Sequence, residues 1–443
     1  MEGVKPDLLL TCAHVLCLDA EGSQLPAGFV AIAGDKIIAV GAMSNCPEVS
    51  QAATVIDCTG CIVMPGLINC HTHLPMVYFR GMADDLPLMR WLTEHIWPAE
   101  NKHLSPDFVY QATLLAAAES IKCGVTCVND MYIFAADIAR ACEHAGLRAY
   151  VGEGVINYPT PSASSWQEGL RLTEELIAQY KGHTLITPTV CPHAPYSTTP
   201  ELLKALHDVA QEHQLLYHLH VHETEQEREL IEWGKTDESP VHQLKYAGVL
   251  GPRMVAVHAV WIDDHDMRHL RELDCGVAHC PTSNMKLGNG IAPVGSMVEA
   301  ELLIGLGTDG AASNNNLNLW EEIHLASLGA KAVYKNPEIL PAKTALSFAT
   351  SGAAALLRND RLGVLAAGNL ADVIVVEQSG LHLAPSYPHR DGVYGQLVYS
   401  AQAADVRDTI IGGKVLMRNR VLTELDEDEL RAKAQEWVDL YFA

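Results

Sequence analysis

The sequence predicts an α/β protein whose larger part is a (β/α)8 barrel and whose two chain ends together form a small β-sandwich domain. From residue 66 onward, short apolar strands alternate with helical segments, which is the pattern of a parallel sheet. Before residue 64 and after residue 365, short strands and turns predominate instead. Eight barrel strands are expected near residues 66–73, 124–130, 148–154, 184–191, 215–222, 254–260, 275–280 and 302–308.

The segments between these strands have the length and the apolar periodicity of helices. A long insertion, residues 74–105, follows the first strand, and we place the barrel at residues 65–364. In such barrels the active site lies at the C-terminal ends of the strands. Helices are expected at residues 106–122, 135–145, 165–180, 200–213, 263–273 and 342–357.

The two chain ends carry strand patterns that are too short to form a core on their own. Gly34-Asp35 predicts a hairpin turn between two N-terminal strands, and an amphipathic helix is expected from about residue 427 to 441. We therefore predict one composite β-sandwich domain made of residues 1–64 and 365–443. Its strands are expected at residues 7–18, 29–33, 36–40, 55–63, 373–377, 406–411 and 414–417.

Composition excludes several classes of partner. A formal net charge of −24 argues against binding to nucleic acid, which needs clustered Lys and Arg, and against anionic membrane surfaces. No apolar stretch of about 20 residues is present, and the N-terminal segment has no signal-peptide pattern. The twelve cysteines are scattered along a chain too large to need disulfides. We expect a cytoplasmic protein that acts on a small molecule.

Histidines occur where the predicted strands end. His71 and His73 close the first strand, and side chains two apart in a strand point the same way. An isolated His-x-His pair can equally be structural, with one ring capping a turn and the other in the core. The fifth strand offers three alternating histidines, His218, His220 and His222, and any of them could be a metal ligand.

Two further strand ends add polar groups. His258 ends the sixth strand, and Asp309 follows the eighth. Each has an ordinary explanation alone, because barrel histidines are often satisfied by hydrogen bonds and Thr-Asp-Gly is a common turn. Three or more histidines and one aspartate at the ends of strands one, five, six and eight are hard to explain as packing. The pattern favours a metal site.

The motifs around these residues resemble the amidohydrolase superfamily, specifically its mononuclear-zinc deaminases and chlorohydrolases. The resemblance selects His220 among the three alternating histidines and leaves His218 and His222 as barrel-lining residues. It implies that His71, His73, His220 and Asp309 bind one Zn²⁺, or Fe²⁺ or Mn²⁺, per subunit. The fourth strand, residues 185–190, lacks the lysine that bridges two metals in binuclear relatives. The matching motifs span residues 65–73, 220–224, 279–284 and 307–309, with His258 between them.

The resemblance also implies a catalytic set. Glu223 is expected to protonate the purine ring nitrogen and then to pass a proton to the departing ammonia. His258 is expected to orient the attacking water and to stabilise the attacked centre, and Asp309 is expected to accept a proton from that water. Both Glu223 and Asp309 should therefore also contact the substrate.

Within the superfamily, the insertion resembles that of the deaminases of 5'-methylthioadenosine and S-adenosylhomocysteine. By this similarity Glu100 binds the ribose hydroxyls, since a carboxylate can accept hydrogen bonds from a diol, and His193 binds substrate at the end of strand four. Members that take S-adenosylhomocysteine have an arginine near the end of strand three, where this chain has Glu153. We expect Glu153 to repel the amino-acid carboxylate. The expected reaction is hydrolytic deamination of 5'-methylthioadenosine to 5'-methylthioinosine and ammonia.

S-adenosylhomocysteine and adenosine remain further candidate substrates. The pocket for the 5' substituent is expected to draw on Tyr78, Met82 and Trp91. One alternative is a deaminase or chlorohydrolase of a free base or triazine, such as guanine or 8-oxoguanine, which would leave Glu100 without a ribose. A second alternative is a non-catalytic scaffold barrel, which would be expected to have lost ligands. The resemblance further suggests a homo-oligomer.

Overall fold

The computed structural model describes residues 5–234, 237–387 and 391–442. Its barrel strands form two parallel sheets that meet at Val190 and Tyr217, and β14 lies against β6 to close the ring. With β9 and β10 sharing one position, the ring has the eight positions that the sequence predicts. Its strands are β6 (Leu67–Thr72), β7 (Val125–Tyr132), β8 (Arg148–Val155), β9 (Ile186–Pro188), β10 (Cys191–Pro192), β11 (Tyr217–Val221), β12 (Met254–His258), β13 (Gly276–His279) and β14 (Leu303–Leu306).

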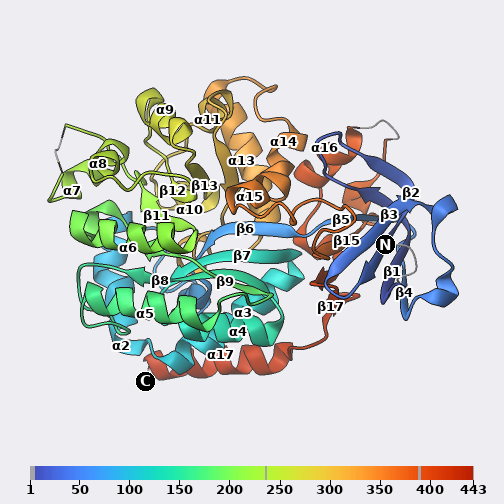
Figure 1. Cartoon of the computed structure of the whole chain (residues 1–443), viewed down its shortest axis with the longest axis horizontal. Helices are drawn as coiled ribbons and strands as arrows, with labels where there is room; N and C mark the ends of the chain where they lie inside the picture. The colour runs from blue at the N-terminus through green and yellow to red at the C-terminus, as the bar shows by residue number, and fades with distance from the viewer. Residues whose placement is uncertain (1–4, 235–236, 388–390, 443) are drawn as a thin grey trace.

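Helices cover the outside of the ring (Figure 1). Every residue of β6 and β7 is buried, as expected for strands that lie between a helical layer and the barrel core. The side chains of Ser105 and Thr199 accept hydrogen bonds from the first turns of α3 and α6, each of which has proline at its first position. The outer helices include α3 (Pro106–Lys122), α4 (Ala135–Ala145), α5 (Trp166–Gln179), α6 (Pro200–His213) and α9 (Asp264–Glu272).

The predicted helix 342–357 is wrong as a single element. It is divided into α14 (Ala342–Ser347) and α15 (Ser351–Leu356). The carbonyl groups of Phe348 and Ala349 accept hydrogen bonds from the backbone N–H groups of Leu306 and Ile68, at 2.9 and 2.8 Å. These carbonyls are thus turned toward the barrel strands and cannot continue a helix.

The insertion after β6 is helical and lies at the C-terminal ends of the barrel strands. It contributes a buried apolar face that includes Trp91, Leu92 and Ile96. No helix of the described residues is long and apolar enough to cross a membrane. The insertion comprises η3 (Leu74–Phe79), α1 (Leu88–Trp91), η4 (Leu92–Ile96) and α2 (Trp97–His103).

Strands from both chain ends share one sheet beside the barrel (Figure 1). β5 and β15 pair antiparallel at its centre, with Met64 opposite Ile374. Gly34, at φ +57°, forms the predicted turn between β2 and β3. The strands are β1 (Leu8–Leu16), β2 (Gln24–Ala33), β3 (Lys36–Ala42), β4 (Thr54–Asp57), β5 (Cys61–Pro65), β15 (Val373–Glu377), β16 (Val406–Ile411), β17 (Lys414–Arg418) and β18 (Val421–Leu422). Helix α17 (Glu427–Phe442) follows.

A buried ion pair joins the barrel to this sheet. Arg148 of β8 donates from Nε and Nη2 to the two carboxylate oxygens of Asp372, at 2.7 and 2.9 Å. The side chains are 6% and 3% exposed. Asp372 also accepts from the backbone N–H of Gly412, and Arg148 donates to the carbonyl of Thr184. All charged groups of the pair are therefore satisfied inside the protein.

Replacing Asp372 with alanine is expected to lower the free energy of unfolding by about 3–5 kcal/mol, because Arg148 would remain buried without its counter-charge. The matched control is Glu94→Ala in the exposed pair Arg90–Glu94, where each side chain is at least 50% exposed. That change is expected to cost about 0.5 kcal/mol or less. Urea unfolding of the two variants measures both effects, and equal losses would contradict the prediction.

Candidate active site

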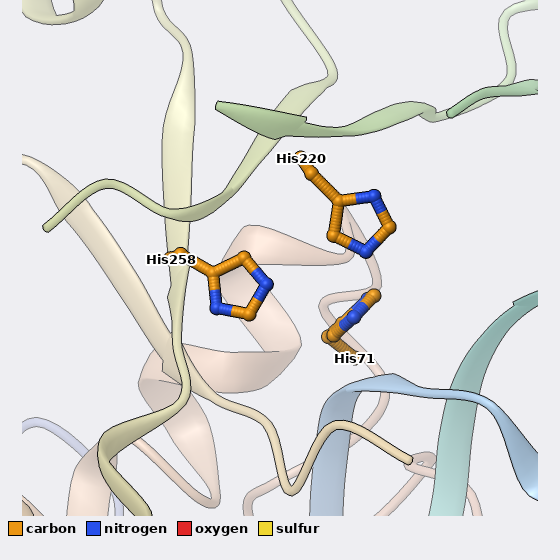
Figure 2. A group of neighbouring side chains, drawn as sticks. All are labelled: His71, His220 and His258. Atoms are coloured by element: carbon orange, nitrogen blue, oxygen red, sulfur yellow. The ribbon is translucent and has the colours of Figure 1, made fainter. Parts of the chain in front are cut away.

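Five side chains from four strand ends converge at the C-terminal end of the barrel. His71 lies in β6, and His73 follows that strand directly. His220 and His258 lie in β11 and β12, and Asp309 follows β14. Figure 2 shows His71, His220 and His258 turned toward a common space. The strand positions predicted from the sequence thus place the residues together.

The polar atoms of this cluster are close enough to share one ion. Oδ1 of Asp309 lies 3.3 Å from Nε2 of His71 and 3.2 Å from Nε2 of His73. The ligand atoms of His71, His220 and His258 all lie within 4.8 Å of one another, as do those of His71, His73 and Asp309. The four predicted metal ligands and His258 therefore form one continuous group.

Each of the four histidines has its Nδ1 atom occupied by a partner outside the cluster. Such outer hydrogen bonds fix the ring and its tautomer in metal sites. Nε2 of His71 is buried and has no aligned hydrogen-bond partner among the described residues. The Nδ1 partners are Nε2 of His218 for His71 (3.0 Å), the Met131 carbonyl for His73, the His193 carbonyl for His220 (2.7 Å) and Oδ1 of Asn284 for His258 (2.8 Å).

The electrostatics of the cluster favour a cation. Burial lowers the pKa of His71 to about 3 and that of His220 well below its usual value, so both rings are neutral and can act as ligands. Burial would raise the pKa of Asp309, but the neighbouring imidazoles hold it well below its usual range. Burial also opposes charge on His73, yet Asp309 raises its pKa to about 9. A positive charge is thus stabilised beside Asp309, and the donor set fits a divalent metal ion.

Asp309 is held in a single orientation. Its Oδ2 accepts hydrogen bonds from the hydroxyls of Ser283 and Ser313, at 2.6 and 2.8 Å, and its Oδ1 accepts from the backbone N–H of Gly310 at 2.8 Å. Oδ1 also faces His71 and His73. Ser313 was not predicted as part of the site. The sequence offered one indication of its role, namely its position four residues after Asp309 in a short helical segment.

Glu223 lies just beyond β11, beside the cluster. Its Oε2 is 3.7 Å from Nε2 of His258, and its Oε1 accepts from the side-chain amide of Asn289 at 2.8 Å. Burial and the negative charge of Asp309 raise the pKa of Glu223 to about 8. A carboxyl group with its pKa raised in this way can act as a general acid near neutral pH.

A cavity of about 490 Å³ opens above the cluster, within the range of small-molecule sites. Glu100 and His193 both line it, as predicted, together with His73, His220 and Asp309. Among the described residues, no lysine or arginine lines the cavity. Its outer part is largely apolar and includes Leu88, Met89, Trp91, Leu92, Ile96, Trp97, Ile133, Ile156, Tyr158, Pro159 and Pro161.

Glu100 and His193 are each oriented by a neighbouring side chain. The hydroxyl of Tyr132 donates to Oε1 of Glu100, and burial raises the pKa of Glu100 to about 7. Nδ1 of His193 is 2.8 Å from the hydroxyl of Ser197. Tyr132 was missed because the second strand runs two residues further than the sequence suggested.

The expectation for Glu153 is wrong. Its carboxylate accepts hydrogen bonds from the backbone N–H groups of Phe134 and Ala135, at 3.3 and 2.9 Å, and from the hydroxyl of Ser162 at 2.5 Å. Gly154, the next residue of β8, lines the cavity, so Glu153 points to the other face of the strand. It binds the start of α4 and cannot repel a substrate.

Two of the three residues expected around the 5' substituent also lie elsewhere. Trp91 lines the cavity, but Tyr78 and Met82 do not. Tyr78 packs against Phe108 with ring centroids 5.3 Å apart, in the contact between the insertion and α3. His218 is buried in the barrel beneath His71, in agreement with a barrel-lining role.

Comparisons with known proteins agree with this geometry. The model of the amidohydrolase family matches residues 62–416. The chain is 43% identical over 438 residues, 98% of both chains, to the 5-methylthioadenosine/S-adenosylhomocysteine deaminase of Syntrophobacter fumaroxidans. It is 40% identical over 97% of both chains to a 5'-deoxyadenosine deaminase of Methanosarcina mazei.

A solved structure extends the likeness to three dimensions. The crystal structure of an adenosine deaminase from Xanthomonas campestris with bound zinc superposes with a TM-score of 0.93. The two chains are 36% identical, and the match covers 98% of each. With near-complete coverage at this identity, the chain belongs to the amidohydrolase family.

Proposed function

We propose that this protein is a metal-dependent hydrolytic deaminase of adenosine-type nucleosides, with 5'-methylthioadenosine as its preferred substrate. The observation that carries the proposal is the buried Glu223, whose pKa is raised to about 8, beside the histidine–aspartate cluster in a cavity that Glu100 also lines. Glu223 can protonate an aminated ring, and Glu100 can bind a ribose. The names of the relatives, deaminases of such nucleosides, support the same reaction.

His71, His73, His220 and Asp309 would hold one divalent cation. Three imidazoles and one carboxylate suit zinc, which the Xanthomonas campestris structure contains. Such a cation, when bound, lowers the pKa of a water ligand from about 15.7 to about 7. His258, whose Nε2 atom faces the cluster, would orient the attacking water. We assign these metal-binding and orienting roles as part of the proposal.

Two carboxyl groups would move the protons. Glu223 would protonate the ring nitrogen beside the attacked carbon, which makes that carbon a better electrophile. Asp309 would accept a proton from the attacking water through Oδ1. Glu223, deprotonated by that first transfer, would then take up the remaining hydroxyl proton of the added water and pass it to the amino group, which leaves as ammonia while the ring carbon keeps the oxygen as a carbonyl. The proton held by Asp309 would return to Glu223 and complete the cycle.

Glu100 and His193 would bind the nucleoside outside the reacting ring. The carboxylate of Glu100 retains free acceptor capacity after its bond to Tyr132 and can accept from both ribose hydroxyls. A free base such as guanine, or a triazine, would leave Glu100 buried without this partner. This is the observation that favours a nucleoside over the free-base alternative.

Measuring ammonia release from adenosine, 5'-methylthioadenosine, S-adenosylhomocysteine and guanine tests the proposal. The nucleosides are expected to react and guanine is not. If guanine released ammonia faster than every nucleoside, the free-base alternative would replace the proposal. If no substrate reacted and no metal were bound, the scaffold alternative would return.

Among the nucleosides, 5'-methylthioadenosine is expected to have a kcat/KM at least about tenfold above that of S-adenosylhomocysteine, since tenfold is about 1.4 kcal/mol. The reason is the absence of Lys and Arg from the described cavity lining, whose acidic members are Glu100, Glu223, Glu232 and Asp309. A carboxylate on the 5' substituent would find no counter-charge there. Faster turnover of S-adenosylhomocysteine would contradict this preference.

A charge reversal at the cavity edge tests the same argument. Glu232→Arg, at an exposed position of the lining, is expected to raise the use of S-adenosylhomocysteine relative to 5'-methylthioadenosine. Glu229→Arg, also exposed but outside the lining, is the matched control and should leave the ratio unchanged.

We also propose the following domain organisation. Residues 65–364 would form the barrel domain, and residues 1–64 with 365–443 would form a small β-sandwich domain. The shared nine-stranded sheet supports this division. The location in the cytoplasm and the pairing of subunits stay predictions.

A further inference from the structure

One short segment contacts Asp309 and Glu223, the two proposed proton carriers, and also His258, the residue proposed to orient the water. It consists of α10 (Pro281–Lys286) and the turn that follows, up to Asn289. Ser283 donates to Asp309, Asn284 accepts from His258, and Asn289 donates to Glu223. Ser283 and Asn284 contact the metal side of the site, whereas the side chain of Asn289 contacts Glu223.

We propose that Asn289 is a positioning residue for the deamination and that it acts by fixing the orientation of the Glu223 carboxyl group. This inference rests on the proposed function. Nδ2 of Asn289 donates to Oε1 of Glu223 at 2.8 Å, and Asn289 is only 7% exposed. A buried amide in this position offers one fixed donor to the carboxyl group.

The turn that carries Asn289 is itself anchored on two sides. The backbone N–H of Asn289 donates to the carbonyl of Asn284 at 2.9 Å, and its carbonyl accepts from Nε1 of Trp261 at 2.8 Å. Gly288 and Gly290 flank it at φ +71° and +119°, backbone conformations that favour glycine. The backbone that carries the amide is therefore held in place by contacts that do not involve Glu223.

The bond determines which oxygen of Glu223 carries the proton. An amide N–H donates and cannot accept, so Oε1 serves as the acceptor and the proton of the neutral carboxyl group resides on Oε2. Oε2 is the oxygen nearer to Nε2 of His258, at 3.7 Å. The proton would leave Oε2 for the ring nitrogen, and Oε2 would then take up the remaining hydroxyl proton of the added water and pass it to the amine. Without Asn289 the carboxyl group would lose the hydrogen bond that orients it.

The experiment is a double-mutant cycle on purified, metal-loaded protein with 5'-methylthioadenosine. Asn289→Ala is expected to lower kcat about 10–100-fold, a range typical of residues that orient a reacting group. KM and metal content should stay the same. In a Glu223→Gln background the same change should lower kcat less than about twofold, because residues that act as a unit are not additive. Asn289→Ser, which keeps a donor, should recover part of the loss.

The matched control is Asn316→Ala. The amide of Asn316 donates to Oε2 of Glu321 at 2.9 Å, so it makes the same kind of bond outside the cavity. Loss of this hydrogen bond in Asn316→Ala should leave kcat unchanged. An unchanged kcat in Asn289→Ala, or an equal loss in the presence and absence of Glu223→Gln, would overturn the inference.

The inference can fail separately from the proposed function. If the wild-type protein deaminated no nucleoside, the proposed function would fail, and a crystal structure of the Asn289→Ser or Asn289→Ala variant would still judge the positioning. A rotated Glu223 carboxyl group in the alanine variant supports the inference. A carboxyl group that keeps its wild-type orientation there overturns it.

Discussion

Glutamine at position 223 is expected to reduce kcat for deamination by about 10³-fold, within the 10²–10⁴ range typical of general acid–base groups. The amide of glutamine has nearly the same shape as the carboxyl group but cannot give up a proton and take it back. Both proton transfers proposed for Glu223, a buried group with a raised pKa, would therefore be lost. KM should change much less than kcat, because Glu100 and His193 would still bind the nucleoside.

Steady-state assays of ammonia release measure this effect. Glu225→Gln is the matched control, because Glu225 is exposed, lies two residues further on and does not line the cavity. Metal content should equal that of the wild type in both variants. A Glu223→Gln protein with full activity would remove Glu223 from the mechanism.

The second large effect concerns the metal ligands. His220→Ala is expected to reduce bound metal from one ion per chain to about one tenth of that or less, and to abolish ammonia release. His220 contributes one of three imidazoles, and its ring is already neutral and held by the His193 carbonyl. A site with two imidazoles and one carboxylate loses much of its affinity.

His222 offers a close comparison because it lies two residues from His220. Its Nδ1 atom is 3.9 Å from Asp266 Oδ2, outside the cluster, and its φ of +52° is a conformation that asparagine tolerates. His222→Asn should therefore keep one metal per chain, measured by elemental analysis. Loss of metal from His222→Asn and not from His220→Ala would reverse the assignment of the ligand.

The barrel, and the convergence of histidine and aspartate side chains at its strand ends, could be predicted from the sequence because both depend on local patterns. Buried parallel strands are continuous apolar runs, and polar residues at their ends stand out against them. His71, His73, His258 and Asp309 were therefore found from strand ends alone. The choice of His220 over His218 and His222 needed the family resemblance, since alternation places all three on one face.

Other features depended on the direction of a side chain or on a backbone contact. Glu153 was assigned to the cavity from its position in the chain, but Gly154 beside it faces the cavity and Glu153 does not. Asn289 and Ser313 lie after strand ends in turns and short helices, where the sequence carries no periodic signal. The break between α14 and α15 results from hydrogen bonds to distant strands, which no local pattern encodes.

The most direct test measures product and metal on the same sample. Purified protein with a determined metal content is incubated with 5'-methylthioadenosine, and ammonia and 5'-methylthioinosine are quantified together. We predict equal amounts of both products at one metal per chain, with activity lost on chelation and restored by zinc. A protein that holds one metal per chain and yet releases no ammonia from 5'-methylthioadenosine, adenosine or S-adenosylhomocysteine would contradict the assignment as a nucleoside deaminase.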